Sequence, residues 1–430
     1  MDDTHDPKRR SFVDVPPDSH FPIQNLPFGV FRPKGEASGR VGVRIGESVL
    51  DLAGAAARGW LDACRHVPHG VFEAPALNPF LALGRPAWSE VRGTVSDLLR
   101  SDAPRLRDDP IARARLLLPV AEVEMLLPAL IGDYTDFYSS REHATNVGTL
   151  MRGKDNALMP NWLHLPVAYH GRASSIVPSG TAVRRPLGQT NPDEGAAPRF
   201  GPSQVLDFEL EMGFLVGPGN ALGQPIRIDE AEAHVFGLLL VNDWSARDIQ
   251  KWEYQPLGPF GSKNFATTVS PWVVTLEALE PFRCAPPVQE PAPLPYLRGS
   301  DDFTYDVQLE VLFRPAQSAE AAVISRSNFR QLYWTMSQQL THHTVTGCNL
   351  RPGDLLASGT ISAPDAGGYG SLLELTWRGT KPLELPGGVT RRFLEDGDTL
   401  ALSGRCAGAA YSIGFGECSG TVLPALERWP

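Results

Sequence analysis

Residues 235–241 read VFGLLLV and are followed at once by Asn242 and Asp243. An unbroken apolar run of this length is typical of a strand that is buried on both faces, because a half-buried strand alternates apolar and polar residues. A carboxylate directly after such a strand lies where sheet proteins commonly carry functional groups. The run therefore predicts a central strand with Asp243 at the edge of a functional site.

The segment that follows Asp243 reads WSARDIQKWEY and ends at Tyr254. If it is helical from Asp243 onward, then Arg247, Gln250 and Tyr254 share one polar face with that aspartate. An ion pair between Asp243 and Arg247 across one helical turn is the structural alternative. A role in a site explains Asp243 better, because a merely solvated face would not follow a buried strand.

Two glutamates, Glu209 and Glu211, alternate with apolar residues in residues 205–216. The alternation predicts a strand with both carboxylates on one face. Residues 303–311 alternate in the same way, and there the pattern predicts an ordinary solvated sheet face. Alternation alone therefore leaves two interpretations of the glutamate pair open, a site and a wet surface.

Residues 131–152 contain two aspartates, two tyrosines, one histidine and two arginines in 22 positions. No apolar period runs through the segment, so it is predicted to be a loop rather than a helix or a strand. Such a loop is either a solvated connector or a functional loop carried by a scaffold. The acidic residues elsewhere in the chain favour a functional loop.

The carboxylates that stand out are Asp136, Glu209, Glu211 and Asp243. A set of oxygen ligands that needs no cysteine or histidine suits a hard cation, Ca²⁺ or Mg²⁺, rather than zinc or copper. Four negative charges brought together without an ion would repel one another. A divalent ion, with Arg247 and Lys263 nearby, would offset most of that charge.

Further patterns predict the surrounding elements. Residues 41–52 alternate around Gly46-Glu47 and predict a hairpin, and the spacing of apolar residues in 88–99 predicts a helix. The other expectations are an apolar bridge between two domains in 116–127, a long loop in 180–201, an amphipathic helix in 329–340, and a strand in 371–377 (SLLELTW) whose Glu374 needs a partner if it is buried.

Length and composition limit the class of protein. A chain of 430 residues favours two domains, and 41 glycines with 39 prolines favour a strand-rich fold. The net charge of -10, without a block of lysine and arginine, argues against nucleic acid or an anionic membrane as partner. Five scattered cysteines predict neither a disulfide framework nor a zinc site. With no secretory signal and no membrane-spanning run, we expect a reduced, cytoplasmic protein.

Several long strings resemble the fumarylacetoacetate hydrolase family, and the likeness covers nearly the whole chain from about residue 25. The string NDWSARDIQ in residues 242–250 is far more specific than a short motif. The other matching segments are residues 133–148, 153–175, 206–212, 241–260, 338–362 and 415–426.

The resemblance implies a mainly β fold with some helix (α+β) and a homodimer. It implies a small SH3-like N-terminal barrel, at residues 26–120, and a catalytic β-roll domain, at 121–430. The polar, proline-bearing residues 1–25 before the barrel predict an N-terminal arm. The resemblance also implies a small-molecule substrate, 4-fumarylacetoacetate, whose carbon–carbon bond is hydrolysed to fumarate and acetoacetate in the last step of tyrosine and phenylalanine catabolism.

By matched motif, the resemblance also implies roles for individual residues. His143 would activate water with Glu374 orienting it, and the leaving carbanion would be stabilised by Arg247, Gln250 and Lys263. The implied substrate contacts are Tyr138, Arg152, Tyr169, Gln250, Tyr254 and Thr360. The implied metal ligands are Asp136, Glu209, Glu211 and Asp243, with a second, Mg²⁺-type site at Asp243, Lys263 and Thr267. Ser262 and Ala266 stand at positions where the family pattern has glycine.

Two alternatives stay open from the sequence. One is a related hydrolase of the same family that acts on acylpyruvates or other β-diketones, although the shorter relatives with that activity usually lack the N-terminal domain. The other is a metal-binding protein without catalysis, and His143 and Glu374 argue against it because a structural ion needs neither.

Overall fold

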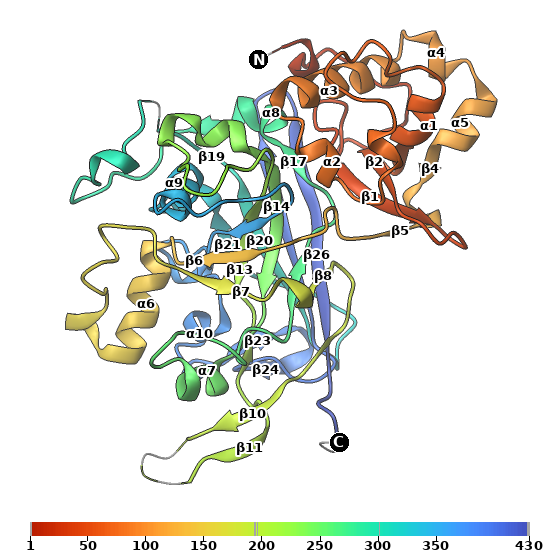
Figure 1. Ribbon diagram of the computed structural model, residues 1–430. Coiled ribbons are helices and arrows are strands. Elements are labelled where there is room, and N and C mark those ends of the chain that lie inside the picture. Colours follow the sequence, from red (N-terminus) through yellow and green to blue (C-terminus); the bar gives the residue numbers. More distant parts are fainter. Residues whose placement is uncertain (1, 193–194, 196, 301, 428–430) are drawn as a thin grey trace.

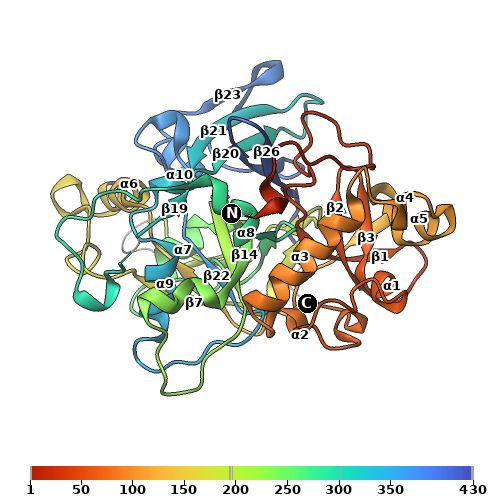
Figure 2. The ribbon, with the colours of Figure 1, turned by 90° about the horizontal axis from the view of Figure 1, so that it is seen from above.

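The structure is a computed structural model that describes residues 2–192, 195, 197–300 and 302–427. An N-terminal domain, red to orange in Figure 1, packs against one end of a larger domain built on sheets. In the view from above in Figure 2, the N-terminal domain again lies to one side of the larger domain. The mainly β fold with some helix is therefore confirmed.

The N-terminal domain is built on an antiparallel sheet in the order β4-β3-β2-β1-β5. Its strands are β1 (Phe28–Pro33), β2 (Arg40–Ile45), β3 (Ser48–Asp51), β4 (Leu117–Pro119) and β5 (Val123–Met125). The hairpin predicted in residues 41–52 is confirmed, except that Leu52 begins a helix, because the Asp51 carboxylate accepts the N–H of Gly54 at 3.0 Å and caps it. The apolar segment 116–127 is not a bridge, since it supplies β4 and β5 to this sheet.

The helix predicted in residues 88–99 is confirmed as α3 (Arg85–Leu99), with Trp88, Val91 and Val95 buried. Its Arg92 is buried and donates to the backbone carbonyls of Gln24 and Asn25, which holds the polar N-terminal segment against the domain. The shorter helices of this domain are α1 (Leu52–Ala57), α2 (Asn78–Leu81), α4 (Pro104–Arg107) and α5 (Pro110–Leu116).

The central sheet of the larger domain has the order β7-β6-β22-β13-β14-β16-β8, with β17 also paired to β14. Its strands are β6 (Tyr134–Phe137), β7 (Ala168–Gly171), β8 (Ile176–Pro178), β13 (Leu210–Val216), β14 (Val235–Asp243), β16 (Thr267–Val269), β17 (Val274–Thr275) and β22 (Leu355–Ala357). The central buried strand predicted from VFGLLLV is confirmed, because every residue of β14 is buried.

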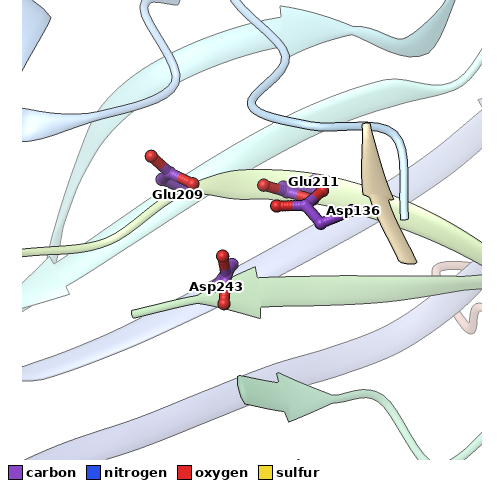
Figure 3. Close-up of side chains that lie close together, drawn as sticks. All are labelled: Asp136, Glu209, Glu211 and Asp243. Atoms are coloured by element: carbon purple, nitrogen blue, oxygen red, sulfur yellow. The ribbon is translucent and has the colours of Figure 1, made fainter. Parts of the chain in front are cut away.

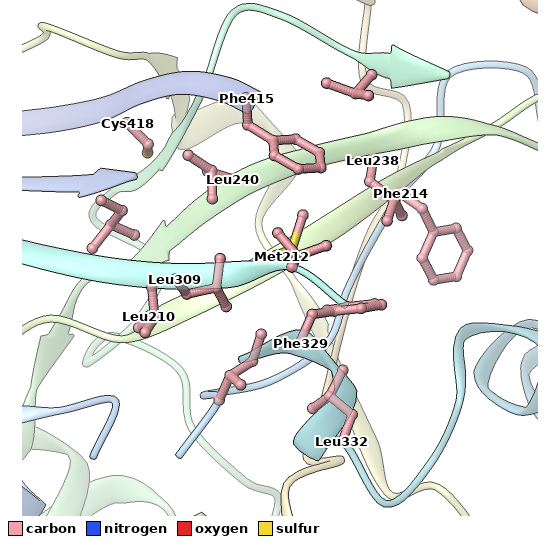
Figure 4. Packing of buried hydrophobic residues seen from close by; sticks show 14 of the residues in the cluster. Leu210, Met212, Phe214, Leu238, Leu240, Leu309, Phe329, Leu332, Phe415 and Cys418 are labelled. Carbon is pink, nitrogen blue, oxygen red and sulfur yellow. The ribbon is translucent and has the colours of Figure 1, made fainter. Parts of the chain in front are cut away.

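The side chains of β14 alternate between two apolar cores. Leu238 and Leu240 enter the inter-sheet core, which we define by its buried residues Leu210, Met212, Phe214, Leu309, Val311 and Phe415 (Figure 4). Phe236, Leu239 and Val241 enter the interdomain core, which we define by its buried residues Phe28, Phe80, Trp88 and Val95 of the N-terminal domain. A strand that is covered on both faces has no solvent-exposed position at which a polar side chain would be favoured, which explains the unbroken apolar run.

A second large sheet, in the order β21-β20-β25-β26-β9, closes the inter-sheet core. Its strands are β9 (Val183–Arg184), β20 (Gln308–Arg314), β21 (Ala322–Asn328), β25 (Thr399–Ala407) and β26 (Ser412–Leu423). The long loop predicted in residues 180–201 is wrong, because that region contains β9 and the hairpin β10 (Leu187–Thr190) and β11 (Arg199–Pro202). The other short strands are β12 (Leu206–Asp207), β15 (Ser245–Ala246), β18 (Arg283–Cys284), β19 (Thr304–Tyr305), β23 (Leu383–Leu385) and β24 (Val389–Arg391).

One helix prediction and one strand prediction need correction. The helix expected over residues 329–340 begins only at α9 (Met336–Thr344), because Thr335 forms a capping box with Gln338 at its start. The strand expected in residues 371–377 is instead the short helix α10 (Leu372–Leu375), with Ser371 as its N-cap. The other helices of this domain are α6 (Arg141–Arg152), α7 (Arg247–Glu253) and α8 (Leu276–Leu279).

Each of the cysteines is a free thiol. Within the described residues, no helix combines the length and the apolar character that crossing a bilayer requires.

Candidate metal and catalytic site

The acidic residues singled out in the sequence meet at one place in the central sheet (Figure 3). Asp136 comes from β6, Glu211 from β13 and Asp243 from the last position of β14, while Glu209 immediately precedes β13. One carboxylate oxygen from each lies within 4.8 Å of the others. None of these residues is more than 5% exposed, so the solvated-surface interpretation of the glutamate pair is wrong.

All these carboxylates lie on one face of the sheet because side chains alternate along a strand. Tyr134, two residues before Asp136, and Leu215, four residues after Glu211, belong to the interdomain core. Val241, two residues before Asp243, belongs to it as well. The N-terminal domain therefore covers one end of this face with apolar contacts, and the carboxylates occupy the same face where the apolar cover ends.

The loop predicted in residues 131–152 is wrong. The segment forms β6, which pairs with β22 and β7 and is buried along its length, followed by α6. The Ser140 side chain starts α6 by accepting the backbone N–H of His143 at 3.3 Å. The apolar period is absent because Asp136 and His143, which occupy buried positions, belong to a polar site rather than to an apolar core.

Two buried cations balance part of the negative charge. The Lys263 ammonium donates to Glu209 and, at 2.6 Å, to Asp243, and an Arg247 nitrogen lies 2.7 Å from the other oxygen of Glu209. Burial alone would raise the pKa of Glu209. The charges of Lys263, Arg247 and His143 outweigh burial and hold that pKa well below its ordinary range.

Asp136 and Glu211 are less well compensated than Glu209. Burial, reinforced by the neighbouring acids, raises the pKa of Asp136 and of Glu211 well above their ordinary values. Among the described residues, Oε1 of Glu211 is buried without a hydrogen-bond partner. When all four carboxylates are ionised, Lys263 and Arg247 leave at least two negative charges uncompensated, because Arg247 is shared with Asp207, and Oε1 of Glu211 has no partner among the described residues. A divalent cation would satisfy both, so the residues present fit a metal ion.

The backbone N–H of Gly359 donates to both Asp136 and Glu211, at 3.1 Å each. Gly359 has a φ of +77°, and a Cβ there would lie 2.1 Å from the carbonyl oxygen of Phe137. Any other residue would be strained and would collide with the main chain, so this close approach requires glycine.

The helix predicted to run from Asp243 is wrong at its start. Asp243 ends β14, the chain passes through β15, and α7 begins only at Arg247. The ion pair considered between Asp243 and Arg247 is also wrong, because Arg247 donates instead to Asp207 at 2.8 Å and pairs with Glu209. Gln250 remains close to Arg247, with 3.2 Å between its Oε1 and the guanidinium.

His143 and Glu374, 231 residues apart in the chain, are joined by a bond of 2.7 Å between Nδ1 and Oε2. Both residues are buried. The Glu374 carboxylate also accepts from Asn146, Ser362 and Ser371, at 2.9, 2.9 and 2.8 Å. Although burial opposes it, the charge of His143 and these hydrogen bonds lower the pKa of Glu374. An ionised Glu374 accepts a hydrogen bond from Nδ1–H, which keeps the proton on Nδ1 and leaves Nε2 as the basic nitrogen.

Tyr138, Tyr169 and Thr360 also lie at the site. The Tyr138 ring meets His143 edge-on, with 5.3 Å between centroids. The Tyr169 hydroxyl donates to Asp243 at 2.8 Å, as does that of Thr267. The Thr360 hydroxyl is buried and has no partner among the described residues.

Arg152 and Tyr254 are more peripheral. Arg152 is exposed at the end of α6 and donates to the carbonyls of Asn156 and Ala157. Burial raises the pKa of Tyr138, and the charge of Arg152 opposes that rise. Tyr254 is 39% exposed just after α7. A cleft of about 430 Å³ leads to the site and includes Tyr169 and Lys263 in its wall.

Sequence reasoning missed the residues that hold the site residues in place. Asp207 binds Arg247, and Asn146, Ser362 and Ser371 surround Glu374. The sequence could have indicated Asp207, because it continues the alternation of Glu209 and Glu211 by one more step. Ser371 also had a local signal, because a serine three residues before a glutamate is a helix-start pattern. Asn146 and Ser362 had none, since they come from other segments of the chain.

The chain matches two family models. Residues 24–128 match the model described as "Fumarylacetoacetase N-terminal", and residues 133–423 match that described as "Fumarylacetoacetate (FAA) hydrolase C-terminal". Curated relatives named fumarylacetoacetase include one from Bos taurus, 56% identical, and one from Homo sapiens, 55% identical. Each comparison covers 97% of this chain and 99% of the relative.

A solved structure described as that of an HpcE protein from Mycobacterium smegmatis shares the fold, with a TM-score of 0.53 at 20% identity. That comparison covers 92% of this chain and 99% of the other. The matched models together span nearly the full length, and the curated relatives are more than half identical over almost all of it. This chain therefore belongs to the fumarylacetoacetate hydrolase family.

Proposed function

We propose that this protein hydrolyses the carbon–carbon bond of 4-fumarylacetoacetate, giving fumarate and acetoacetate, the last step of tyrosine and phenylalanine catabolism. The observation that carries the proposal is the buried His143–Glu374 pair beside a carboxylate cluster fit for a metal ion. A protein that only stored or bound a cation would have no use for an oriented imidazole. The names of the curated relatives supply the substrate.

His143 is the general base. Glu374 holds the proton on Nδ1, so Nε2, which has no hydrogen-bond partner in the described part of the chain, can take a proton from water. The resulting hydroxide forms a bond to the carbonyl carbon of the fumaroyl group, the one joined to the acetoacetate carbon. The carbon–carbon bond then breaks, its electron pair stays with the acetoacetate carbon, and that carbon takes a proton back from His143.

Arg247, Gln250 and Lys263 stabilise the leaving carbanion as its enolate. Carbon is a poor leaving group, so donors that are aimed at the developing charge lower the barrier more than any other contribution. Nη2 of Arg247 is buried and has no partner among the described residues, so this charged donor is available to the substrate. A guanidinium nitrogen left without a partner in the interior is costly unless a ligand completes it.

Tyr138, Arg152, Tyr169, Gln250, Tyr254 and Thr360 are the proposed substrate contacts. The buried, unpartnered hydroxyl of Thr360 suits a carbonyl oxygen. Arg152 suits the terminal carboxylate, because a guanidinium binds carboxylates through paired donors.

The ion is Ca²⁺ or Mg²⁺, held by Asp136, Glu209, Glu211 and Asp243, since the site offers oxygen ligands alone. When bound, it would polarise the oxygens of the diketone. A second, Mg²⁺-type site at Asp243, Lys263 and Thr267 would have to use oxygens other than the Lys263 side chain, because that ammonium is itself a cation.

The test is the loss of diketone absorbance in the ultraviolet after purified protein is added, before and after dialysis against a chelator. We expect turnover of 4-fumarylacetoacetate that a chelator abolishes and added Ca²⁺ or Mg²⁺ restores. Faster turnover of acylpyruvates would transfer the proposal to a related hydrolase of the same family. Ion binding without turnover of either class would leave a non-catalytic metal-binding protein.

We also propose a cytoplasmic homodimer. Two-fold pairs are the commonest assemblies, and Leu257 and Phe260 are 96% and 73% exposed just after α7. Light scattering should give twice 46.8 kDa, about 94 kDa. A mass of one chain at micromolar concentration would contradict the dimer.

A further inference from the structure

Asp207 is a buried carboxylate for which the reaction above has no use. It is 0% exposed, and it lies outside the group of acids that can hold an ion. A carboxylate inside a protein is costly unless specific partners satisfy it. The identity of its partners therefore indicates what Asp207 does.

One side of Asp207 binds the guanidinium of the site. Its Oδ2 accepts Nε of Arg247 at 2.8 Å, while Nη1 of the same arginine lies 2.7 Å from Glu209. Two carboxylates thus fix the plane of the guanidinium from two directions. The nitrogen that has no partner within the described part of the chain, Nη2, is the one proposed to face the substrate.

The other side of Asp207 binds the start of α10. Its Oδ1 accepts the backbone N–H of Leu372 at 2.7 Å, and its Oδ2 accepts that of Leu373 at 3.0 Å. A helix of one turn has little stability of its own, so its place depends on such anchors. The next residue of α10 is Glu374, which holds His143.

We propose that Asp207 is a positioning residue that couples Arg247 to the Glu374–His143 pair, so that the base and the enolate-stabilising cation are held as one unit. The role in turnover rests on the proposed function. Asp207 itself touches neither water nor substrate in this arrangement, and it acts through Arg247 and through the backbone of α10.

The chain contains a matched control, Asp398. It is also 0% exposed, and it accepts two nitrogens of Arg391, at 2.8 and 3.0 Å. It likewise accepts two backbone N–H groups, from Ala316 at 3.0 Å and Glu395 at 2.8 Å. The chemistry is that of Asp207, but none of these partners belongs to the site.

The first experiment compares Asp207→Asn with Asp398→Asn. Both substitutions place an amide N–H₂ against existing donors, so we expect similar losses of thermal midpoint. Only Asp207→Asn should lower kcat, by roughly 10- to 100-fold with little change in KM, because a small misplacement of reacting groups costs this much. A kcat like that of Asp398→Asn would overturn the proposal.

A double-mutant cycle with Glu374→Gln separates coupling from general damage. If Asp207 acts partly through Glu374, the combined loss of kcat should be clearly smaller than the product of the single losses. Losses that multiply in full would show that Asp207 does not act through Glu374 and would overturn the coupling.

The second experiment needs no turnover. In protein with ¹⁵N-labelled histidine, the His143 signals are assigned by their absence from His143→Ala. The original protein and Asp398→Asn should show His143 with its proton on Nδ1, and Asp207→Asn should show a shifted or mixed tautomer. An unchanged spectrum would overturn the proposal. If the original protein fails to cleave 4-fumarylacetoacetate, the proposed function fails while this measurement still tests Asp207.

A further variant covers the case in which Asp207→Asn does not fold. Asp207→Glu keeps the charge and adds one methylene group, which displaces α10 in a fully buried position. Its kcat should fall by at least about tenfold, whereas a role in neutralising Arg247 alone would leave it unchanged. A kcat and a His143 spectrum equal to those of the original protein would overturn the proposal.

Discussion

Strands β13 and β20 carry the same alternation of apolar and acidic residues, and their apolar side chains enter the same inter-sheet core. Their opposite faces differ. On β20, Glu310 pairs with Arg326 at 2.8 Å, and the two side chains are 43% and 68% exposed. On β13, Glu211 is 0% exposed.

The difference comes from what covers the second face, not from the strands themselves. The second face of β20 is partly open to solvent, so an acid there is hydrated. The second face of β13 continues into the interdomain core, where Leu215 packs with residues of the N-terminal domain. An acid on a covered face is costly unless it serves a ligand, and this cost is what makes β13 a site and β20 a surface.

The largest effect on metal affinity and turnover should come from replacing the acid on β13, with the acid on β20 as the control. Glu211→Gln removes a charged oxygen ligand, so we expect metal affinity and turnover to fall together, by roughly 10²-fold or more. Glu310→Gln should change neither. Titration calorimetry and turnover assays of both variants measure this, and unchanged ion binding by Glu211→Gln would remove it from the ligand set.

The next effect concerns the pair that lies beside β13. His143→Ala should leave folding and metal binding intact while turnover falls by roughly 10²-fold or more. Glu374→Gln should give a similar or smaller loss, and the double variant should be little worse than the worse single one.

The pH–rate profile sharpens this prediction. Because the pKa of Glu374 is below its ordinary value, Glu374 stays ionised through the neutral range. Removing its charge in Glu374→Gln disfavours the protonated imidazole, so the acid limb of the profile should move to lower pH. Losses that multiply in the double variant, or an unmoved acid limb, would assign Glu374 another role.

Truncating a buried leucine on the apolar face of either strand should lower the unfolding free energy by a similar amount. Leu210 and Leu309 are buried in the same core, at 0% and 1% exposure. Truncating either to alanine should cost about 2–5 kcal/mol of unfolding free energy, because each removes a similar number of buried atoms. Denaturant unfolding measures both changes. A clearly smaller decrease in unfolding free energy for Leu309→Ala than for Leu210→Ala would mean that β20 packs more loosely than β13.

The smallest effect should have the opposite sign. Without an ion, the acids around Glu211 repel one another, so Glu211→Gln should unfold at a slightly higher temperature than the original protein when both are metal-free. Glu310→Gln should leave the midpoint unchanged, since exposed ion pairs contribute little. A metal-free Glu211→Gln that is less stable would mean that this carboxylate contributes to folding as well as to binding.

Much of the fold was predictable where burial repeats along a single segment. The buried strand β14, the hairpin of β2 and β3 and the helix α3 all follow from the spacing of their apolar residues. The same reasoning went wrong at β6 and α6, because their buried positions include Asp136 and His143. Periodicity reports apolar burial, and it cannot detect a polar side chain that is buried for another purpose.

The residue types alone indicated hard-cation chemistry, because oxygen ligands without thiols or imidazoles exclude the softer metals. Sequence also made Glu374 conspicuous as an acid among apolar neighbours. Which acids meet depended on sheet order, since β22 and its parallel pairing with β6 bring Asp136 beside Glu211. Which partner Glu374 finds depended on α10, whose position Ser371 and Asp207 hold. Local composition decides how a segment prefers to fold, but strand pairing and buried anchors between distant segments decide where its functional groups meet.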